Sequence, residues 1–542
     1  MTLSILVAVI PFLGFSIARL FSNADVAARH PFTFIERFIY QICGINPLED
    51  MTWKNYAKAL IYFNLAGIFL LFSILKFHGM SFGLSLNVAI SFVTNTNWQA
   101  YSGEVDLTPM IQMLGLGVQH FLSAATGIAV VLVLARSIKR KLSAGVGNFW
   151  TDLVRSTIYV LLPLSLIGSL ALVSQGVVQS FSADQEIISL EGKPQAMKVG
   201  PVASQVAIKQ LGSNGGGYYG ANSAHPFENS TPFSNFLQIL ALLLLPGALI
   251  FTYGLLVDDR KHAWALFGAS FALFIVGLTI VFWAQAQGNA FLGGLPFLEG
   301  VELRNGLASS SFWAAATSAS SNGSVNLSLT SMSPISGLVA LFNILTGEVI
   351  FGGVGSGVYG LVLYAILTVF LAGLMVGRTP EYLGKKITAD IVILSSIGVL
   401  GPALLILIFS SVATISTLGL SALGHAGPHG LTEVLYAFGS MVGNNGSAFG
   451  SLNASSPFYL WAGSFCMFLG RFGVILPVIA VAGKFAAAKI TPPSSGTFPT
   501  NGPTFAVLLI VVVILDGALT FFPAFALGPY LEHLLMIAGR GF

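Results

Sequence analysis

The chain has 542 residues, and its 24 Lys and Arg and 21 Asp and Glu make up only 8% of them, with a formal net charge of +3. Soluble globular proteins carry roughly 25% charged residues, whereas 55% of this chain is hydrophobic and its mean hydropathy is +0.82. The composition excludes a soluble protein and the small net charge excludes a nucleic-acid partner, so an integral membrane protein in contact with the lipid bilayer is predicted.

No motif of an ATP-hydrolysing or other hydrolytic enzyme is present. The sequence lacks the Walker A pattern GxxxxGK[ST], the zinc-binding pattern HExxH and the nucleophile pattern GxSxG. The two cysteines, Cys43 and Cys466, have no CxxC spacing and are predicted to be free thiols. We therefore expect no catalytic residue and no covalent cofactor, and any ATP hydrolysis has to come from another chain.

Ten stretches are long and apolar enough to cross a membrane as helices, which takes about 20 mostly apolar residues. In chain order they are 3–20, 59–77, 113–135, 156–176, 234–257, 263–285, 357–377, 389–414, 458–483 and 503–527. The first has Arg19 after its apolar run and no basic residue before it, which favours an uncleaved anchor over a signal peptide. The chain is predicted to be an all-α polytopic membrane protein.

The basic residues predict the orientation of these spans. Seventeen of the 24 Lys and Arg lie on alternate loops or beside them, and six lie on the opposite side. Because cytoplasmic loops of membrane proteins carry the excess of Lys and Arg, the first set is predicted to be cytoplasmic. Both termini are then predicted to be extracytoplasmic.

Each of the four outward loops between spans two and nine holds a short apolar segment followed by a cluster rich in Asn and Gly. The segments and their clusters are Leu84–Val93 with 94–97 (TNTN), Val202–Leu211 with 213–216 (SNGG), Ser310–Ser320 with 321–324 (SNGS) and Glu433–Val442 with 444–447 (NNGS). Each segment is too short to span the bilayer. Successive clusters begin between 108 and 123 residues apart, so a unit of helix, re-entrant pore loop and helix is predicted to occur four times.

A single Asn-Gly pair is most often a turn, but four clusters at matching positions on one side favour a shared site. Irregular backbone at membrane depth is tolerated where it is buried or lines a watery cavity. Glycine permits a positive φ, and four such loops can point their carbonyls at a central pore, where they replace the hydration shell of a monovalent cation. No carboxylate lies within the clusters, which favours K⁺ over Ca²⁺. The predicted K⁺ ligands are Asn95, Thr96, Ser213, Asn214, Gly215, Gly216, Ser321, Asn322, Gly323, Asn444, Asn445 and Gly446.

The predicted repeat divides the chain into six parts. They are an N-terminal span with its cytoplasmic loop (1–58), four pore repeats (59–135, 156–257, 263–377 and 389–483) and a C-terminal span (503–542). The third repeat has a broken second helix: residues 335–351 are apolar but contain Gly347 and Glu348 and run into a glycine-rich stretch before 357–377. The two terminal spans lie outside the fourfold arrangement.

Here the chain resembles a known family almost from end to end. The segments TNTNWQAYSGE (94–104), GSNGGGYYGANSAHPFEN (212–229), GEVIFGGVGSGVYG (347–360), GRTPEYLGKK (377–386) and GSAFGSLNASSPF (446–458) are similar to the potassium-binding subunit of the bacterial Kdp potassium-transporting ATPase. The resemblance implies a complex with a separate P-type ATPase subunit, a small accessory subunit and, in some complexes, a short membrane peptide. This chain would be the channel-like part that selects extracytoplasmic K⁺, without catalytic residues of its own.

Four further residues are candidates for supporting the filter or the exit of the ion. Gln99 follows the first cluster and is predicted to brace it, and Arg378 closes span seven as a gate or as a residue that reaches the cytoplasmic interface. Arg471 lies near the middle of span nine, where a charge is costly and indicates either function or a structural ion pair. Glu348 is its predicted partner, because both lie 27 residues after the start of their own clusters.

One alternative stays open at this point. A stand-alone K⁺ channel or symporter of the Trk, Ktr or HKT kind, gated by a cytosolic regulatory ring, would share a fourfold pore. The long matching segments and the two additional terminal spans favour the pump subunit. An intramembrane enzyme is less well supported, because the sequence has no acid/base or nucleophile constellation.

Overall fold

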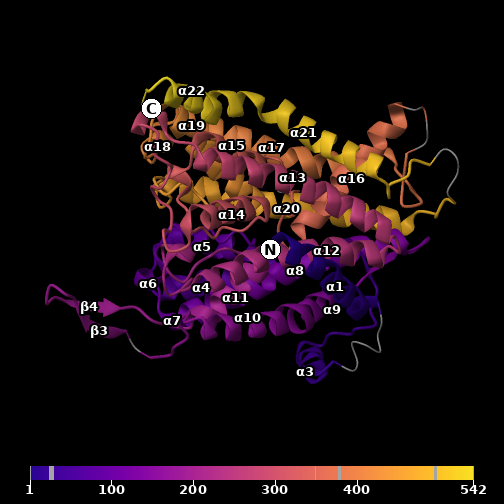
Figure 1. The fold of residues 1–542 in the computed structure, drawn as a ribbon. Helices are drawn as coiled ribbons and strands as arrows, with labels where there is room; N and C mark the ends of the chain where they lie inside the picture. Colours follow the sequence, from indigo (N-terminus) through magenta and orange to yellow (C-terminus); the bar gives the residue numbers. More distant parts are fainter. Residues whose placement is uncertain are drawn as a thin grey trace.

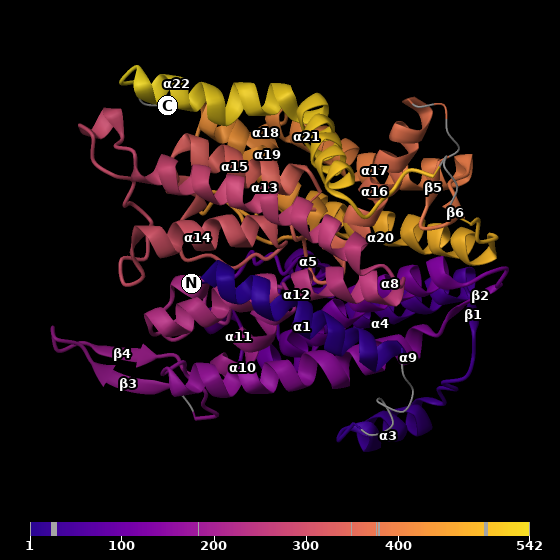
Figure 2. The same cartoon turned by 45° about the vertical axis from the view of Figure 1, so that its right-hand side comes forward.

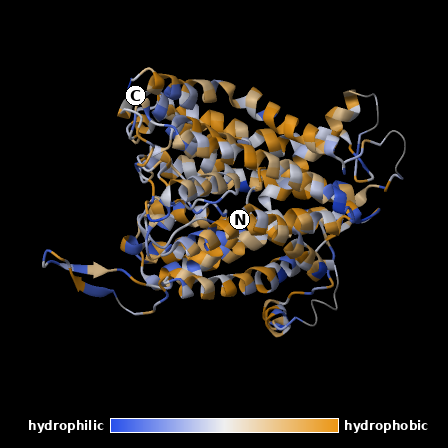
Figure 3. Ribbon diagram, in the orientation of Figure 1, coloured by the Kyte–Doolittle hydropathy of each residue, from blue (hydrophilic) through white to orange (hydrophobic). Residues whose placement is uncertain are grey.

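The computed structural model describes residues 2–22, 30–182, 184–347, 349–375, 377, 380–492 and 497–540. Within these ranges ten helices are long and apolar enough to cross a membrane. They lie side by side in one elongated bundle, with most of the loops gathered at its two ends (Figures 1 and 2). Hydrophobic residues cover the helices and hydrophilic residues concentrate in the end loops (Figure 3), as expected for a bundle surrounded by lipid.

Each predicted span overlaps one of these helices, so the prediction of a ten-span all-α protein is confirmed. The spans are α1 (Thr2–Ser22), α4 (Trp53–Phe77), the continuous segment α7–η1–α8 (Pro109–Ile111, Gln112–Gly117 and Val118–Lys139), the segment α9–η2–α10 (Phe149–Arg155, Ser156–Leu161 and Leu162–Ser174), α12 (Pro232–Leu256), α13 (Arg260–Ala286), α16 (Ser356–Met375), α17 (Ala389–Ile415), α20 (Pro457–Ala487) and the segment α21–η6–α22 (Pro503–Phe525, Ala526–Tyr530 and Leu531–Ile537). The two predicted thiols are free, with Cys43 exposed and Cys466 buried.

Shorter helices occupy the connections between the spans. They are α3 (Thr33–Cys43), α5 (Phe82–Val93), α6 (Gly103–Asp106), α11 (Val202–Leu211), α14 (Gly306–Ala319), α15 (Pro334–Leu345), α18 (Thr417–Leu420) and α19 (Gly427–Gly443), with the single 3₁₀ turns η3 (Asn222–Ala224), η4 (Ala290–Leu292) and η5 (Leu329–Ser331). The four predicted short segments correspond to α5, α11, α14 and α19. The α11 bounds match the prediction, while α14 and α19 begin a few residues earlier.

Three two-stranded antiparallel sheets lie in the end loops. They are β1 (Met51–Thr52) with β2 (Gly145–Gly147), β3 (Gln185–Ile188) with β4 (Pro194–Met197), and β5 (Glu381–Tyr382) with β6 (Lys385–Lys386). In the longest pair, Gln185 lies opposite Met197, and this hairpin projects from one end of the bundle (Figure 2). Met51, Val146 and Tyr382 on these strands pack into the core. The buried Lys385 donates to the carbonyl oxygens of Arg140 and Ala488 and so joins the ends of α8 and α20.

The centre of the bundle is formed around α8, most of whose residues are buried. It packs against α12, α16 and α20, and also against the short helices α5 and α11. The segment before α8 makes a π-helical turn, η1. The N-terminal half of α8 carries the buried side chains of Gln119, His120 and Ser123. This polar interior faces the loops that follow α5 and α11.

Candidate functional site

The four clusters begin where four short helices end. Each helix is followed by a residue in the left-handed conformation: Asn95 with φ 66°, Ser213 with φ 46°, Ser321 with φ 53° and Asn444 with φ 59°. Asparagine and serine adopt this conformation at helix C-termini more readily than β-branched or bulky residues. The chain therefore leaves each helix by the same kind of turn.

These left-handed residues define the register of the four clusters. In the second, third and fourth clusters the left-handed residue is the first residue of the cluster. In the first cluster, which the sequence analysis begins at Thr94, the left-handed residue is the second one, Asn95. The corresponding triplets are Asn95-Thr96-Asn97, Ser213-Asn214-Gly215, Ser321-Asn322-Gly323 and Asn444-Asn445-Gly446. We call these twelve residues the ring, because the contacts between them close on themselves.

Three of the four neighbouring pairs of clusters are joined by direct hydrogen bonds, while the third cluster is hydrogen-bonded to the end of α11, the helix that precedes the second cluster. Asn214 Nδ2 donates to Asn95 Oδ1 at 2.7 Å, Asn322 Nδ2 donates to the carbonyl of Lys209 at 3.2 Å, Ser321 Oγ donates to the carbonyl of Asn444 at 3.3 Å, and Asn444 Nδ2 donates to Thr96 Oγ1 at 2.9 Å. The contacts run from the first cluster to the second, third and fourth and back to the first. All of the predicted ligands are buried except Gly446, which is half-buried.

The ring backbones approach one another too closely for side chains at two glycines. A Cβ on Gly215, which has φ +86°, would lie 2.0 Å from the backbone nitrogen of Gly323. A Cβ on Gly446, with φ +96°, would lie 2.0 Å from the carbonyl oxygen of Thr96. Glycine is required here both for the positive φ and for the contact between chains.

A vestibule of about 560 Å³ opens onto the ring. Its lining includes the third residue of every ring triplet, Asn97, Gly215, Gly323 and Gly446. The other lining residues are mostly small or neutral polar, and Asp106 is the one carboxylate among them. A dehydrating cation that enters this vestibule therefore meets backbone carbonyls and amides rather than a cluster of acidic side chains.

The opposite side of the ring is covered by the connection between α15 and α16, of which the structure describes residues 346–347 and 349–355. The amide nitrogen of Val354 donates to Ser213 Oγ at 2.6 Å, and that of Gly352 donates to the carbonyl of Ala319 at 2.8 Å. α15 ends at Leu345 and α16 begins at Ser356, and the connection between them lies directly against the second and third clusters. The same segment contacts α8, because a Cβ on Gly127 would meet the carbonyl oxygen of Val354.

Gln99 joins the loops that follow the first two clusters. Its Oε1 accepts a hydrogen bond from the amide of Gly217 at 2.8 Å, and its Nε2 donates to the carbonyl of the same residue at 3.0 Å. This two-point contact fixes the chain one residue beyond Gly216. Its position agrees with the predicted bracing, and the effect on ion selection stays a prediction.

Arg471 is buried on α20, with 3% of the residue exposed, and its Nη2 donates to the carbonyl of Ser123 at 3.0 Å. Ser123 Oγ in turn donates to Asn95 Oδ1 at 2.8 Å, so Ser123 links the guanidinium of Arg471 to the ring. No carboxylate pairs with Arg471 among the residues that the structure describes. Glu348 and Arg378 lie outside the described residues, so the predicted pair of Glu348 and Arg471 stays a prediction.

Two features of the site were missed by the sequence reasoning. Asn97 is the ring residue where the other triplets have glycine, and it has φ 55°. Lys209, which the sequence places on an outward loop, is fully buried on α11 and paired with Glu228. A lysine within an apolar half-helix is a signal that could have revealed this pair, because a buried charge needs a partner.

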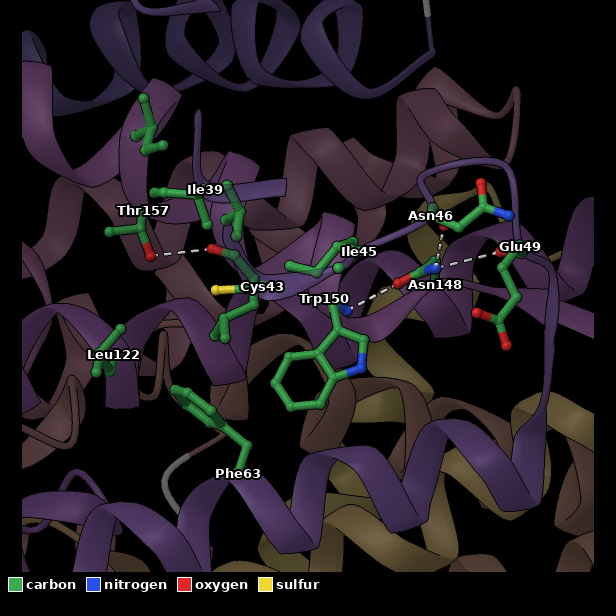
Figure 4. Close-up of a pocket in the computed structure, with 14 residues that line it drawn as sticks. Ile39, Cys43, Ile45, Asn46, Glu49, Phe63, Leu122, Asn148, Trp150 and Thr157 are labelled. Carbon is green, nitrogen blue, oxygen red and sulfur yellow. Dashed lines mark hydrogen bonds between the residues drawn. The ribbon is translucent and has the colours of Figure 1, made fainter. Parts of the chain in front are cut away.

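A second cavity, of about 610 Å³, lies between α3, α4 and α9 and has a different character (Figure 4). Its lining is mostly apolar, with Phe63, Leu122 and Trp150 on its walls. Asn148 is occupied by contacts with the backbone, since its Nδ2 donates to the carbonyl of Asn46 at 3.0 Å and its Oδ1 accepts from the amide of Trp150 at 2.9 Å. This cavity shares no residue with the ring or its vestibule.

Near this cavity, α3 is attached to the bundle through one buried acid, Glu36. Arg155 Nε donates to Glu36 Oε1 at 2.7 Å, and the hydroxyl of Tyr159 also donates to this carboxylate. Burial alone would raise the pKa of Glu36, but the hydrogen bonds from Arg155 and two tyrosines outweigh it and hold that pKa below its ordinary value.

The ten apolar helices and the buried polar ring between them define a polytopic membrane protein with a polar centre. The sequence model of the family described as "Potassium-transporting ATPase A subunit" matches residues 1–534, and the chain belongs to this family. The match covers all four clusters and the α15–α16 connection.

Three relatives show how much of the chain this similarity covers. Each is described as a "Potassium-transporting ATPase potassium-binding subunit". The one from Leptospira interrogans serovar copenhageni is 51% identical over 94% of this chain and 93% of its own length. The one from Rhodospirillum centenum is 48% identical over 100% and 97%, and the one from Pseudomonas aeruginosa is 46% identical over 97% and 96%.

A solved structure shares the fold at a much lower identity. The crystal structure of the potassium transporter TrkH from Vibrio parahaemolyticus has a TM-score of 0.53 and 15% identity, and the similarity covers 88% of this chain and 98% of that one. The helical arrangement is therefore similar to that of a protein outside the matched family.

The close contact at Gly446 predicts the effect of a single methyl group. Gly446→Ala combines a positive φ with a clash against the carbonyl of Thr96 and is expected to lower the free energy of unfolding by about 1–3 kcal/mol. Gly450→Ala, in the same vestibule with open space at its Cβ, should change it by less than about 0.5 kcal/mol. Unfolding of the purified protein in detergent measures both, and equal effects would contradict the tight ring.

Proposed function

We propose that this chain is the potassium-selecting and potassium-binding subunit of an ATP-driven K⁺ uptake complex. The observation that carries the proposal is the closed ring of four loops, held together by hydrogen bonds and close backbone contacts, at the floor of an open vestibule. K⁺ from outside the cell binds in the ring and passes through the membrane part of the protein to an ATPase subunit. Membership of the potassium-transporting ATPase A subunit family supports this role.

The ligands are carbonyl and side-chain oxygens of eleven ring residues and of Gly216, which follows the second triplet. They come from Asn95, Thr96, Ser213, Asn214, Gly215, Gly216, Ser321, Asn322, Gly323, Asn444, Asn445 and Gly446. Four sets of carbonyl dipoles replace the hydration shell of a monovalent cation. The C-terminal ends of α5, α11, α14 and α19 add partial negative charge at the same place. The transported ion is substrate rather than a resident cofactor.

The partners follow from what the chain lacks and from the names of its relatives. It lacks the Walker A pattern and the P-type phosphorylation motif DKTG, so a separate P-type ATPase catalytic subunit hydrolyses the ATP. A small accessory subunit and, in some complexes, a short membrane peptide complete the assembly in the bacterial cytoplasmic membrane. The alternative of a stand-alone channel or symporter is not favoured, since the family match covers almost the whole chain and the similarity to TrkH is limited to the fold.

The ion leaves the ring sideways rather than straight through this subunit. A pore open at both ends would dissipate the gradient that the pump builds, and the α15–α16 connection lies where such a pore would continue. Arg471 is buried one residue behind the ring, and its positive charge sets the potential beside this connection. Together with Glu348 and Arg378 it guides K⁺ toward the ATPase subunit.

The first test concerns ion selection. Gly215→Asp places a side chain and a charge where a Cβ alone lies 2.0 Å from Gly323. It is expected to weaken K⁺ uptake about tenfold, a loss of about 1.4 kcal/mol in binding, and to admit Rb⁺ or Na⁺ more readily. Gly450→Asp adds the same charge at an open part of the same vestibule and should retain K⁺ preference. Unchanged affinity and selectivity in Gly215→Asp would mean that the second cluster is only a turn.

The second test concerns the exit. Glu348→Gln and Arg471→Met are each expected to lower K⁺-stimulated ATP hydrolysis of the assembled complex several-fold, because the local potential changes. The K⁺/Rb⁺ preference should be retained, since neither residue is a ring ligand. Arg155→Met removes another partly buried arginine, on the α3 side, and controls for loss of stability. Normal K⁺-driven turnover in both exit variants would leave them structural residues and remove the support for a lateral exit.

The third test concerns orientation. With both termini extracytoplasmic, Ser182, exposed before β3, lies outside, whereas the exposed Ala144 lies inside, as does Cys43. In a chain carrying Cys43→Ser and Cys466→Ser, a membrane-impermeant thiol reagent should label Ser182→Cys in intact cells. It should label Ala144→Cys only after the cells are opened. The reverse labelling pattern would contradict the topology.

A further inference from the structure

Behind the second ring triplet lies an ion pair that is completely enclosed. Lys209, on α11, donates to Glu228, in the loop before α12, and both side chains are 0% exposed. Charges at such a position are costly unless they are paired and hydrogen-bonded. Glu228 is further held because its Oε1 accepts from the amide of Tyr219 at 2.9 Å. The pair is neutral as a whole, so it adds no net positive charge beside the cation site.

The ammonium group of Lys209 fixes the orientation of one side-chain amide. Lysine has three N–H donors and no acceptor. Besides Glu228, Lys209 Nζ donates to Ser223 Oγ at 3.0 Å and to Asn222 Oδ1 at 2.7 Å. The oxygen of the Asn222 amide must therefore face the lysine, and its nitrogen must face the other way.

That nitrogen reaches the ring. Asn222 Nδ2 donates to the carbonyl oxygen of Gly215 at 2.7 Å. If the amide turned over, its oxygen would face the carbonyl of Gly215 and repel it. The chain of contacts from Lys209 through Asn222 to Gly215 thus transmits the position of a buried charge to a ring carbonyl.

This contact makes the second triplet unlike the other three. Asn97, Gly323 and Gly446 occupy the same place in their triplets, and in the part of the chain that the structure describes no donor reaches their carbonyl oxygens. A carbonyl that already accepts a hydrogen bond from an amide has less negative potential to offer a cation than a free one. The ring is therefore chemically unequal at the level of the vestibule floor.

We propose that Lys209, paired with Glu228, is a positioning residue for ion selectivity, which acts by holding Asn222 on the carbonyl of Gly215. This proposal rests on the proposed K⁺-binding function of the ring. The pinned carbonyl keeps the vestibule end of the ring at the size and field that suit K⁺. When the hydrogen bond from Asn222 to Gly215 is lost, the carbonyl of Gly215 moves, and larger or smaller monovalent cations compete better with K⁺.

The experiment compares three variants of the assembled complex. Asn222→Gly removes the amide and tolerates the φ of 53° at this position. The double variant Lys209→Met/Glu228→Gln removes both charges together, so that no lone charge stays buried. The third variant combines all three substitutions. Uptake of K⁺ in competition with Rb⁺ is measured for each, with thermal unfolding of the complex as the check on folding.

Asn222→Gly and the double variant are each expected to lose about tenfold in K⁺/Rb⁺ discrimination, the scale of one hydrogen bond to a polar group in a buried site. The triple variant should lose no more than either, because residues that act in one chain of contacts are not additive. A control pair, Arg136→Met with Asp152→Asn, removes an ion pair away from the ring and should lower stability while preserving discrimination.

Three results would overturn the proposal. They are unchanged discrimination in Asn222→Gly, unchanged discrimination in the double variant, or losses that add in the triple variant. If the double variant does not assemble, Asn222→Gly decides alone, because it leaves the ion pair intact. The proposed function is tested separately by Gly215→Asp: if that variant loses selectivity and Asn222→Gly does not, the ring still binds K⁺ and only the role of Lys209 is refuted.

Discussion

Backbone that leaves the helical conformation inside a membrane has to find its hydrogen bonds within the protein, and the rest of this structure depends on how four loops meet that requirement. Each loop follows a half-length helix and turns through a left-handed residue. Some of its polar groups bond within the loop and its own helix, and others bond to the neighbouring loop or helix. Because every loop needs two neighbours, the arrangement closes into a ring, and isolated loops of this kind would not be stable at this depth.

The ring explains why the surrounding residues are so constrained. Gly215 and Gly446 have no space for a Cβ because neighbouring backbones touch. Gln99 ties the chain beyond the second cluster to that beyond the first, and Lys209 with Glu228 supports the second cluster from behind. The α15–α16 connection is not helical where it packs against the same ring, and its Val354 amide donates a hydrogen bond to Ser213 Oγ. These contacts gather one group of buried polar residues around the ring.

The chemistry of this place suits a weakly held monovalent cation. Carbonyl dipoles and the C-terminal ends of helices provide partial negative charge without a full charge, whereas Ca²⁺ sites use several carboxylates. The vestibule contributes one carboxylate, Asp106, and the ring none. Such a site can release its ion, which a transport protein must do at every cycle.

The large features of the fold were predictable because they depend on length and apolarity. The ten spans, the four half-helices and the broken helix follow from runs of apolar residues and from where Asn and Gly interrupt them. The division into four equivalent repeats stays a prediction. Features that depend on tertiary contacts were not predictable. The register of the first cluster was shifted by one residue because Thr94 and Asn95 are both polar and only the backbone shows which one is left-handed.

Lys209 illustrates a second limit. A lysine in a loop region is normally solvated, and its partner, Glu228, lies on another segment with no spacing that marks a pair. The lysine within an apolar half-helix indicates that a partner exists but not which residue it is, and the contact from Asn222 to Gly215 has no signal in the sequence. Arg471, by contrast, was identified by its depth in an apolar span, because a charge there has no ordinary surface explanation.

The most direct measurement is to locate the ion. A structure of the assembled complex, determined with Tl⁺ or Rb⁺ in place of K⁺, would show the cation through its anomalous scattering. If the ring binds K⁺, a strong anomalous peak will lie inside the ring, at the floor of the vestibule and within ligand distance of oxygens from all four triplets. A ring without a peak, with the cation bound elsewhere in the chain, would contradict it.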